Sequence, residues 1–529
     1  MIYLTLYNNL WIKIDTEDIT SLNLIKEHFS YRPEGYQFSK LYKSGAWNGY
    51  IQLFDYRNRM LPYGLLFDLI KLLKNNNYDI QASDEVKNIY KNYSYDSISF
   101  NYDLKYYPRY YQDEIIKSCI KHKCGVFSSA TASGKSLSLA YIVKILKENN
   151  LINRSLIVVP TTSLIIQFYD DLIEYGIDEN LLGKFYADSK DWDKPILIST
   201  WQSLSHDPEK IRQNELKEIH KELRKKSLSD ENKEYYTNRK EIITSSEYLD
   251  RIKKLKSYKN KLLKSIDCVI IDEVQSATSR SVSDLLKQIP NAEYRFGCTG
   301  TLPDEKLDVQ NIKSFIGPIL KKYTVEELTN AGYLNKCDIQ MYHLYYNTPM
   351  KGTLNEVKDQ LFESEFRYDV IKDIVNNIGD ENVLILVGRI EKEGKLLENY
   401  LNQQFPDKKV KFVYGGTKTD QREEWRQKCI DENNIILLAS YPVFQAGINI
   451  PNLRYVIFAS SYKSMVRIGQ SIGRSLRTKE GKEDSCIIDL VDHSNKYIPK
   501  QSKERLKYYN KEGFDIQEFV YKEKEYVYC

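Results

Sequence analysis

Short apolar runs recur from about residue 107 onward, separated by segments whose apolar residues have helical spacing. A first series comprises Ser155–Pro160, Pro195–Thr200, Cys268–Ile271 and Arg295–Cys298. A second series comprises Val383–Val387, Val410–Tyr414, Ile435–Ser440, Tyr455–Ser460 and Cys486–Val491. Strands that alternate with helices form parallel sheets covered by helices. The pattern therefore predicts two α/β domains in tandem, joined near residues 317–335.

A phosphate-binding loop is indicated by the run Ser129–Ser136, which reads S-A-T-A-S-G-K-S. It follows the apolar run Gly125–Phe127 and precedes residues that suit a helix, which is the strand, loop and helix setting of such loops. Backbone N–H groups there cradle phosphates, Lys135 reaches the β- and γ-phosphates, and the Ser136 hydroxyl ligates Mg²⁺. The remaining loop residues expected at the nucleotide are Thr131, Ala132, Ser133 and Gly134.

A pair of carboxylates ends a second apolar run, C-V-I-I-D-E-V-Q at Cys268–Gln275. Such a strand delivers one carboxylate, Asp272, to the Mg²⁺ shell and the next, Glu273, to the attacking water as general base. The loop and the acidic pair together predict hydrolysis of a nucleoside triphosphate.

Two further groups of residues fit the same chemistry. Ahead of the loop, Gln112 can pair with an adenine edge beside Arg109 and its neighbouring tyrosines, which makes ATP the expected nucleotide. Near the other end, Gln470, Arg474 and Arg477 have the spacing of one helix face. Permanently charged arginines there suit a transferring phosphoryl group, and a surface ion-pair face is the alternative.

Composition limits the classes of protein to consider. The 529 residues carry 77 Lys and Arg against 73 Asp and Glu, so net charge says little about partners. The eight Cys show no C-x-x-C pair and the six His no ligand spacing, so neither a zinc site nor a disulfide framework is predicted. The absence of a signal-like start or a long apolar run predicts a cytoplasmic protein with no membrane partner.

Two regions differ from the α/β pattern. Residues 1–95 alternate like strands around one helix candidate, Leu65–Lys74, and predict a small α+β domain. Within it, Lys43, Trp47 and Arg57 suit phosphate contacts and base stacking, with ordinary core aromatics as the alternative. The charged stretch 205–264 predicts a helical hairpin inserted in the first α/β domain, or a solvated excursion.

The ordered motifs resemble those of superfamily 2 helicases over about 400 residues. The resemblance implies two RecA-like domains with ATP between them, and Gly447 and Asn449 near the nucleotide. It also implies contacts to nucleic acid from Pro160, Thr161, Thr162, Thr200, Gly388 and Arg389. The chain departs from the usual pattern at Ala132, where Gly is common, and at Asn449, where Asp is common.

A closer resemblance is to the UvsW-type phage recombination helicases. It rests on G-Y-Q-F at Gly35–Phe38, G-A-W-N-G-Y-I at Gly45–Ile51, A-S-Y-P-V-F at Ala439–Phe444 and the lysine-rich segment after Asp492. It implies an ATP-driven motor that remodels forks, junctions and RNA–DNA hybrids in phage replication and recombination, in the host-cell cytoplasm.

The resulting expectation is an α/β protein with domains at residues 1–95, 96–316, 317–500 and an extension at 501–529. It is expected to act as a monomer on branched DNA, with single-strand-binding or recombination proteins as candidate partners. Three alternatives stay open: a double-strand translocase that separates no strands, an RNA helicase, and a catalytically silent DNA-binding scaffold.

Overall fold

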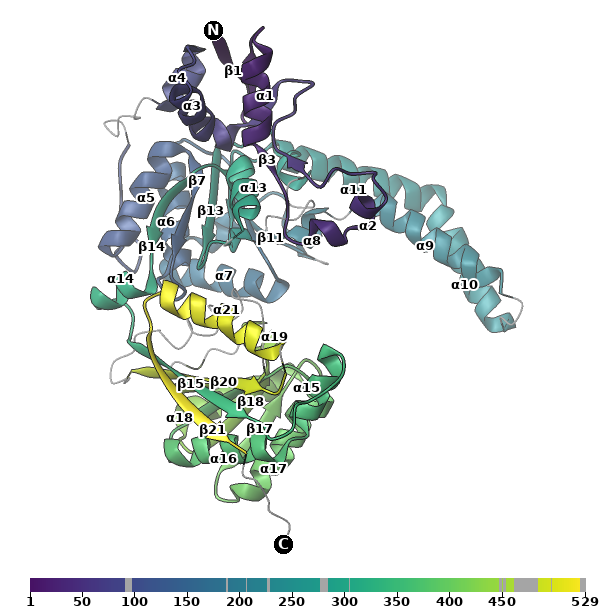
Figure 1. Ribbon diagram of the computed structural model, residues 1–529. Helices are drawn as coiled ribbons and strands as arrows, with labels where there is room; N and C mark the ends of the chain where they lie inside the picture. The colour runs from purple at the N-terminus through teal and green to yellow at the C-terminus, as the bar shows by residue number, and fades with distance from the viewer. Residues whose placement is uncertain are drawn as a thin grey trace. The chain divides into compact units, whose positions relative to one another are not determined.

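A computed structural model describes residues 1–90, 98–186, 189–205, 207–225, 229–275, 284–303, 305–446, 450, 453–460, 484–495 and 497–523. The chain divides into two compact units, residues 1–127 with 136–321 and residues 128–135 with 322–529. Figure 1 shows sheets covered by helices in both, which confirms the predicted α/β class. Within the described residues, no helix is both long and apolar enough to cross a membrane.

The amino-terminal domain is a small α+β domain, as predicted. Its four-stranded sheet has the order β5-β2-β1-β6. The strands are β1 (Ile2–Asn8), β2 (Trp11–Asp15), β5 (Met60–Pro62) and β6 (Ile80–Ala82), and the main helices are α1 (Ile19–His28), α3 (Leu66–Asn75) and α4 (Asp84–Tyr90). Side chains on one face of the sheet are buried, among them Leu4 of β1 and Ile12 of β2. Both are fully buried and pack in one core with Leu69 of α3. Shorter elements are β3 (Ser30–Tyr31), α2 (Lys40–Lys43) and β4 (Ile51–Gln52).

This domain docks on α13 (Lys306–Ile316) of the first α/β domain. Asp68 of α3 forms a largely buried ion pair with Lys313 of α13. Beside it, a Cβ added to Gly64 would lie 1.6 Å from the Lys313 carbonyl oxygen. The two backbones therefore approach each other at a position where only glycine fits.

The first α/β domain contains an eight-stranded sheet in the order β10-β9-β11-β8-β12-β13-β7-β14. The strands are β7 (Cys124–Ser129), β8 (Ser155–Val159), β9 (Leu182–Tyr186), β10 (Ser189–Lys190), β11 (Ile196–Thr200), β12 (Cys268–Ile271), β13 (Tyr294–Thr299) and β14 (Ile319–Tyr323). The helices include α5 (Tyr110–His122), α6 (Lys135–Glu148), α7 (Thr162–Tyr175) and α8 (Trp201–Ser205). The neighbouring strands β9, β11, β8, β12 and β13 pair in parallel, whereas β10 pairs antiparallel with β9. Every residue of β8 and β12 is buried, as expected of strands covered on both faces.

The first sheet extends past the predicted domain boundary. Val126 N donates to Pro318 O at 2.8 Å and Ala130 N donates to Tyr323 O at 3.2 Å, so β14 runs parallel to β7. The predicted second domain begins at residue 317, but β14 belongs to the first sheet. Two lysines in this strand suit a sheet edge and hide its strand pattern.

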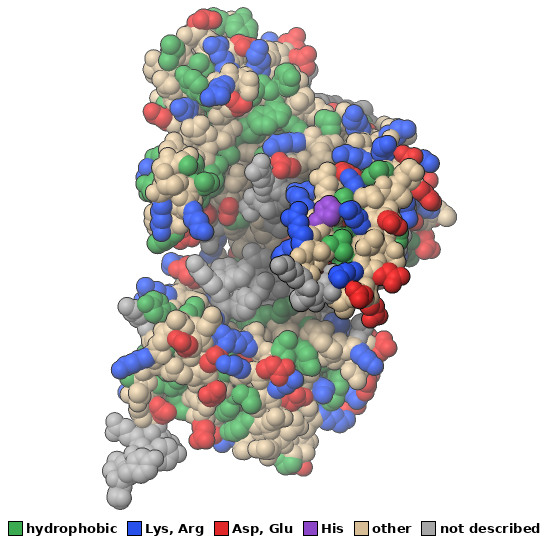
Figure 2. All heavy atoms as spheres, turned by 90° about the vertical axis from the view of Figure 1, so that its right-hand side faces the viewer, with side chains coloured by type: hydrophobic (Ala, Val, Ile, Leu, Met, Phe, Trp, Pro, Cys, Tyr) green, Lys and Arg blue, Asp and Glu red, His purple; other side chains and the backbone are tan. Residues whose placement is uncertain are grey.

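The charged insertion is helical, but it consists of three helices rather than the predicted two-helix hairpin. These are α9 (Pro208–Leu223), α10 (Asp230–Thr244) and α11 (Ser246–Lys264). They project from the first α/β domain in Figure 1. Few of their residues are buried, among them Ile219, Ile243 and Leu262. Figure 2 shows basic and acidic side chains interspersed on the side that it views, so the exposed surface is of mixed charge.

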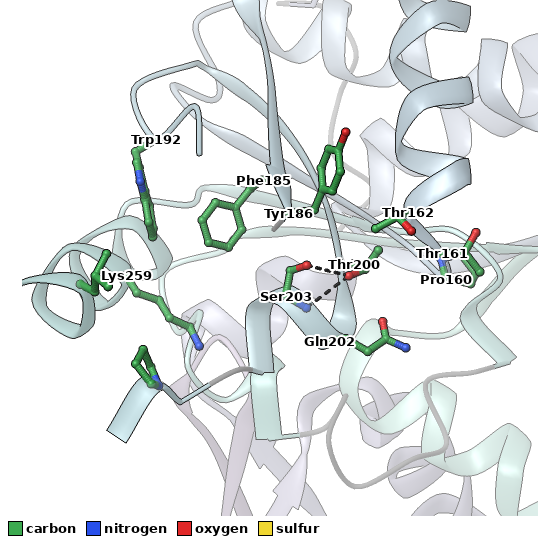
Figure 3. A pocket seen from close by; sticks show the side chains of 12 residues that line it. Pro160, Thr161, Thr162, Phe185, Tyr186, Trp192, Thr200, Gln202, Ser203 and Lys259 are labelled. Atoms are coloured by element: carbon green, nitrogen blue, oxygen red, sulfur yellow. Dashed lines mark hydrogen bonds between the residues drawn. The ribbon is translucent and has the colours of Figure 1, made fainter. Parts of the chain in front are cut away.

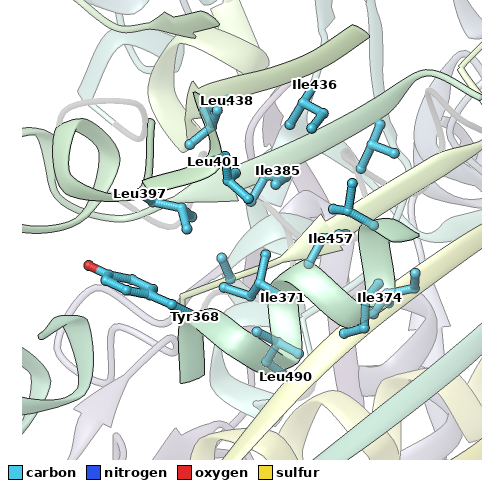
Figure 4. Packing of buried hydrophobic residues seen from close by; sticks show 14 of the residues in the cluster. Tyr368, Ile371, Ile374, Ile385, Leu397, Leu401, Ile436, Leu438, Ile457 and Leu490 are labelled. Atoms are coloured by element: carbon cyan, nitrogen blue, oxygen red, sulfur yellow. The ribbon is translucent and has the colours of Figure 1, made fainter. Parts of the chain in front are cut away.

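The second α/β domain contains a seven-stranded sheet in the order β17-β18-β16-β19-β20-β15-β21, and every pair of neighbours is parallel. The strands are β15 (Cys337–Tyr345), β16 (Val383–Val387), β17 (Lys409–Val413), β18 (Ile435–Ser440), β19 (Tyr455–Phe458), β20 (Ser485–His493) and β21 (Asp515–Lys522). The helices are α14 (Val325–Asn330), α15 (Leu354–Phe362), α16 (Glu365–Ile378), α17 (Lys395–Gln404), α18 (Thr419–Asp431), α19 (Tyr441–Ala446) and α21 (Ile498–Lys511). Figure 4 shows Ile371 of α16 and Leu401 of α17 packing with Ile385 of the sheet.

The carboxyl-terminal segment is part of the second domain rather than an extension of it. β21 pairs in parallel with β15 along eight residues, from Asp338 opposite Asp515 to Tyr345 opposite Lys522. α21 packs on β20 through Arg505, whose guanidinium binds Asp489. The predicted boundary at residue 501 therefore falls inside a helix of the domain.

Candidate functional site

The loop after β7 has the backbone of a phosphate-binding loop. Ala132 and Gly134 have φ angles of 70° and 75°, in the left-handed region. Alternation of left- and right-handed residues turns successive N–H groups toward one side, which creates a concave anion site. Ser129 Oγ donates to Ser133 Oγ at 2.7 Å and steadies the loop. Ala132 adopts the conformation that favours Gly, at a cost of about 1–2 kcal/mol, so the loop keeps its shape.

Lys135 and Ser136 open helix α6, where the helix dipole also favours an anion. Lys135 Nζ donates to Ser129 O at 3.3 Å, so the ammonium lies over the loop. Ser136 Oγ lies 2.8 Å from the Tyr175 hydroxyl. A serine hydroxyl has one donor and two lone pairs, and Ser136 can therefore ligate a cation while it contacts Tyr175.

Asp272 and Glu273 follow β12 directly, and both are half-buried. Asp272 Oδ1 accepts hydrogen bonds from Glu273 N at 2.9 Å and from Cys298 Sγ at 3.1 Å. Glu273 has a φ of 50°, and its Oε2 accepts from Gln275 Nε2 at 2.5 Å. Carboxylate and hydroxyl oxygens are the ligands that Mg²⁺ prefers, so Asp272 and Ser136 fit that ion.

Gln275, which is not among the predicted site residues, orients the predicted general base Glu273. Its Oε1 is buried and has no hydrogen-bond partner among the described residues. Because Gln275 Nε2 donates to Glu273 Oε2, the amide holds the Glu273 side chain in one rotamer. The signal for it in the sequence is a second polar residue on the strand-end turn, two positions beyond Glu273.

Gln112 has a structural role that competes with its predicted contact to adenine. It is 3% exposed and stands at the third position of α5, where its Oε1 accepts from Arg109 N at 2.8 Å. This is the glutamine half of a capping box, which satisfies a backbone N–H ahead of the helix. The contact between Gln112 and a nucleotide stays a prediction.

The predicted nucleic-acid contacts of the first domain differ in accessibility. Thr161 and Thr162 are exposed at the start of α7, beside half-buried Pro160, where helix N–H groups favour phosphate. Thr200 is 3% exposed, and its hydroxyl lies 3.0 Å from Ser203 Oγ and accepts from Ser203 N at 3.2 Å. Figure 3 shows these two bonds. The Thr200 hydroxyl therefore holds the turn into α8.

In the second domain, a buried carboxylate accepts hydrogen bonds from the backbone of the predicted contact residues. Glu393 is fully buried, and its Oε2 accepts from Gly388 N at 2.7 Å and from Arg389 N at 3.2 Å. Ser460 also donates to Glu393, at 2.6 Å to Oε1. Burial raises the pKa of the Glu393 carboxyl, and Arg367 opposes that shift. Glu393 was not singled out from the sequence, although an acid soon after a strand end is typical of such capping.

The Arg389 side chain is likewise engaged within the domain. Its guanidinium forms an ion pair with Asp359 and donates to Asn355 Oδ1 at 3.0 Å. Arg389 must leave Asp359 before its guanidinium can bind a phosphate, so the contact between Arg389 and phosphate stays a prediction.

In the amino-terminal domain, Lys43 and Arg57 are exposed and Trp47 is half-buried. Trp47 Nε1 donates to Tyr50 O at 2.8 Å. Arg32, which is not among the predicted contact residues, lies 4.4 Å from the centre of the Tyr50 ring. The domain thus carries a surface on which basic and aromatic groups meet.

Five predicted site residues lie outside the described residues: Gly447, Asn449, Gln470, Arg474 and Arg477.

The described geometry defines a class of protein. A phosphate-binding loop follows β7, a paired Asp272 and Glu273 follow β12 of the same sheet, and a second parallel sheet follows in the chain. This is the organisation of nucleoside-triphosphate-driven motors with two RecA-like domains.

Three families match separate parts of the chain. "DNA helicase UvsW, N-terminal" matches residues 2–83, "Type III restriction enzyme, res subunit" matches residues 105–304, and "Helicase conserved C-terminal domain" matches residues 367–479. The chain belongs to the superfamily 2 helicases, which depend on ATP, and it carries the amino-terminal domain of the UvsW-type DNA helicases.

Individual relatives agree with this assignment. The ATP-dependent DNA helicase uvsW of Enterobacteria phage T4 is 25% identical over 98% of this chain and 96% of its own length. The DNA 3'-5' translocase XPB2 of Sulfurisphaera tokodaii is 24% identical over 72% of this chain and 81% of its own. The restriction-modification enzyme LlaBIII is similar in fold, with a TM-score of 0.52 and 14% identity over 86% of this chain and 34% of its own.

Proposed function

We propose that the protein unwinds and branch-migrates branched DNA, including forks, junctions and RNA–DNA hybrids, in phage replication and recombination. The observation that carries this proposal is the docked amino-terminal domain. It presents Arg32, Lys43 and Trp47 on one small domain and is held on α13 by the contact at Gly64. A binding domain fixed on the motor lets motor movement act on a DNA arm.

The chemistry of ATP hydrolysis is assigned to named side chains. Lys135 neutralises the β- and γ-phosphates, and Ser136 and Asp272 would hold Mg²⁺, which would supply further charge neutralisation. Glu273, held by Gln275, takes the proton of the attacking water. Gln470, Arg474 and Arg477, which the sequence predicts for the transferring phosphoryl group, are proposed to stabilise its charge. Closure on ATP and opening after hydrolysis move the two domains along the strand.

A second candidate function is translocation on double-stranded DNA without strand separation. The observation in its favour is the 24% identity to a protein named as a DNA translocase. The two activities differ in their product, because only a helicase releases a strand from a fork. A translocase without strand separation displaces a triplex-forming strand from an intact duplex.

An unwinding panel tests the proposal. Forks, four-way junctions, RNA–DNA hybrids and a triplex are incubated with the protein, with and without ATP. ATP-dependent strand release from forks and junctions supports the proposal. Triplex displacement with no strand release replaces it with the translocase, and activity on RNA duplexes alone replaces it with an RNA helicase. The Glu273→Gln variant is the matched control, because it keeps the fold and the nucleotide loop.

A further inference from the structure

The first α/β domain contains a pocket of about 600 Å³ beside the predicted strand-gripping residues. Thr161 and Thr162, at the start of α7, form one part of its wall. Leu255 and Lys259, from helix α11 of the insertion, form another part. The insertion therefore completes a cavity that the core of the domain forms only in part. Its volume falls in the range of roughly 300–1,000 Å³ that is typical of ligand sites.

The wall of the pocket has two chemically different sides. Figure 3 shows Thr161 on one side, and Trp192 and Lys259 on the other, with Phe185 between. Phe185 and Trp192 are in contact, with ring centroids 4.5 Å apart. Hydroxyls at a helix start suit the phosphate backbone of a strand, whereas aromatic rings suit the flat face of a base.

Lys259 adds a positive charge in a partly dehydrated position. Burial lowers the pKa of its ammonium, and Asp207 opposes that shift. An ammonium that has lost part of its hydration is stabilised by an anion that comes near it. A phosphate group is an anion of this kind.

We infer that this pocket, closed by Leu255 and Lys259 of the insertion, binds an unstacked nucleobase of the DNA strand that α7 grips. The inference deepens the proposed function, on which it rests. The base lies against Phe185 and Trp192, and its phosphates lie between the start of α7 and Lys259. The insertion thus converts a sequence-independent grip on the backbone into one that also requires bases.

The test compares two DNA oligomers of equal length, polythymidylate and the same backbone with abasic residues. Stacking of one base contributes about 1–3 kcal/mol, so the wild-type protein should bind the intact oligomer roughly 5- to 150-fold more tightly. In Leu255→Gln, which changes the wall of the pocket, this ratio should fall at least roughly threefold. Lys259→Gln should weaken the binding of both oligomers, because both keep the phosphates. Both positions are on a projecting helix where Gln is well tolerated, so the motor core stays folded.

Lys261→Gln is the charge-matched control, because it lies on the same helix about 200° around from Lys259. It should keep the wild-type ratio even where it weakens binding to both oligomers. An unchanged ratio in Leu255→Gln would overturn the inference, and so would equal binding of intact and abasic DNA by the wild type. Tight binding with ATPase stimulation by both oligomers would then leave the proposed function standing. Failure to bind either oligomer would overturn both.

Discussion

The buried ion pair between Arg505 and Asp489 is expected to hold the carboxyl-terminal helix on the second sheet. Arg505 Nε and Nη2 donate to the two Asp489 oxygens, each at 2.7 Å, and the two side chains are 2% and 0% exposed. Tyr509 Oη also donates to Asp489, at 2.8 Å. Arg505→Met keeps the apolar stem and removes both charged bonds, which leaves a buried carboxylate without its cation. Such a loss costs about 3–5 kcal/mol.

Hydrogen exchange in the full chain measures this cost locally. At about 1.4 kcal/mol per tenfold change, protection of α21 and β20 amides should fall roughly 10²- to 10⁴-fold. Adding Asp489→Asn should restore part of the protection, because it removes the uncompensated buried charge. The matched control is Lys507→Met, on the same helix, since Lys507 is 73% exposed and pairs with Glu504. It should change protection by no more than about threefold. An Arg505→Met variant indistinguishable from this control would refute the reasoning.

Three further predictions concern the motor and its attached domain. Lys135→Ala and Glu273→Gln should both abolish ATP hydrolysis, but only Glu273→Gln should still bind a fluorescent ATP analogue; near-normal turnover in it would exclude Glu273 as the base. Gly64→Ala drives a Cβ into the Lys313 carbonyl, so limited proteolysis should release the amino-terminal domain. Fork unwinding should then fall at least roughly tenfold, whereas DNA-free ATPase should be retained. Equal loss of both activities would contradict this. The folded state holds the Glu393 proton to higher pH than the unfolded chain, because burial raises that pKa. Wild-type stability from this group therefore falls as pH rises from about 4.3 through the folded pKa. Urea midpoints of Glu393→Gln should accordingly rise relative to wild type across that window, and a constant offset would contradict the assignment.

The position of the nucleotide loop between a strand and a helix could be predicted from the sequence because it is local. A run such as Ser129–Ser136 fixes its own strand, turn and helix, and Asp272 and Glu273 follow directly from a strand of buried residues. Both sheets could be predicted for the same reason, since fully buried parallel strands read as continuous apolar runs. The assignment to superfamily 2 helicases rests on the order of these local motifs.

Edge strands and tertiary contacts required the structure. β14 and β21 contain lysines or exposed residues, because an edge strand is buried less than a central one, and neither was predicted. The hydrogen bond from Gly388 N to the Glu393 carboxylate is a side-chain contact that the sequence alone does not single out. The close approach of Gly64 to the Lys313 carbonyl joins two segments far apart in the sequence.

The pocket is the clearest case of this division. The sequence by itself determined a charged helical insertion and a pair of threonines at a helix start. Only the tertiary structure brought Leu255 and Lys259 into the same pocket as Thr161, because the three-helix arrangement of the insertion, rather than any pattern along α11, decides which face of that helix meets the sheet.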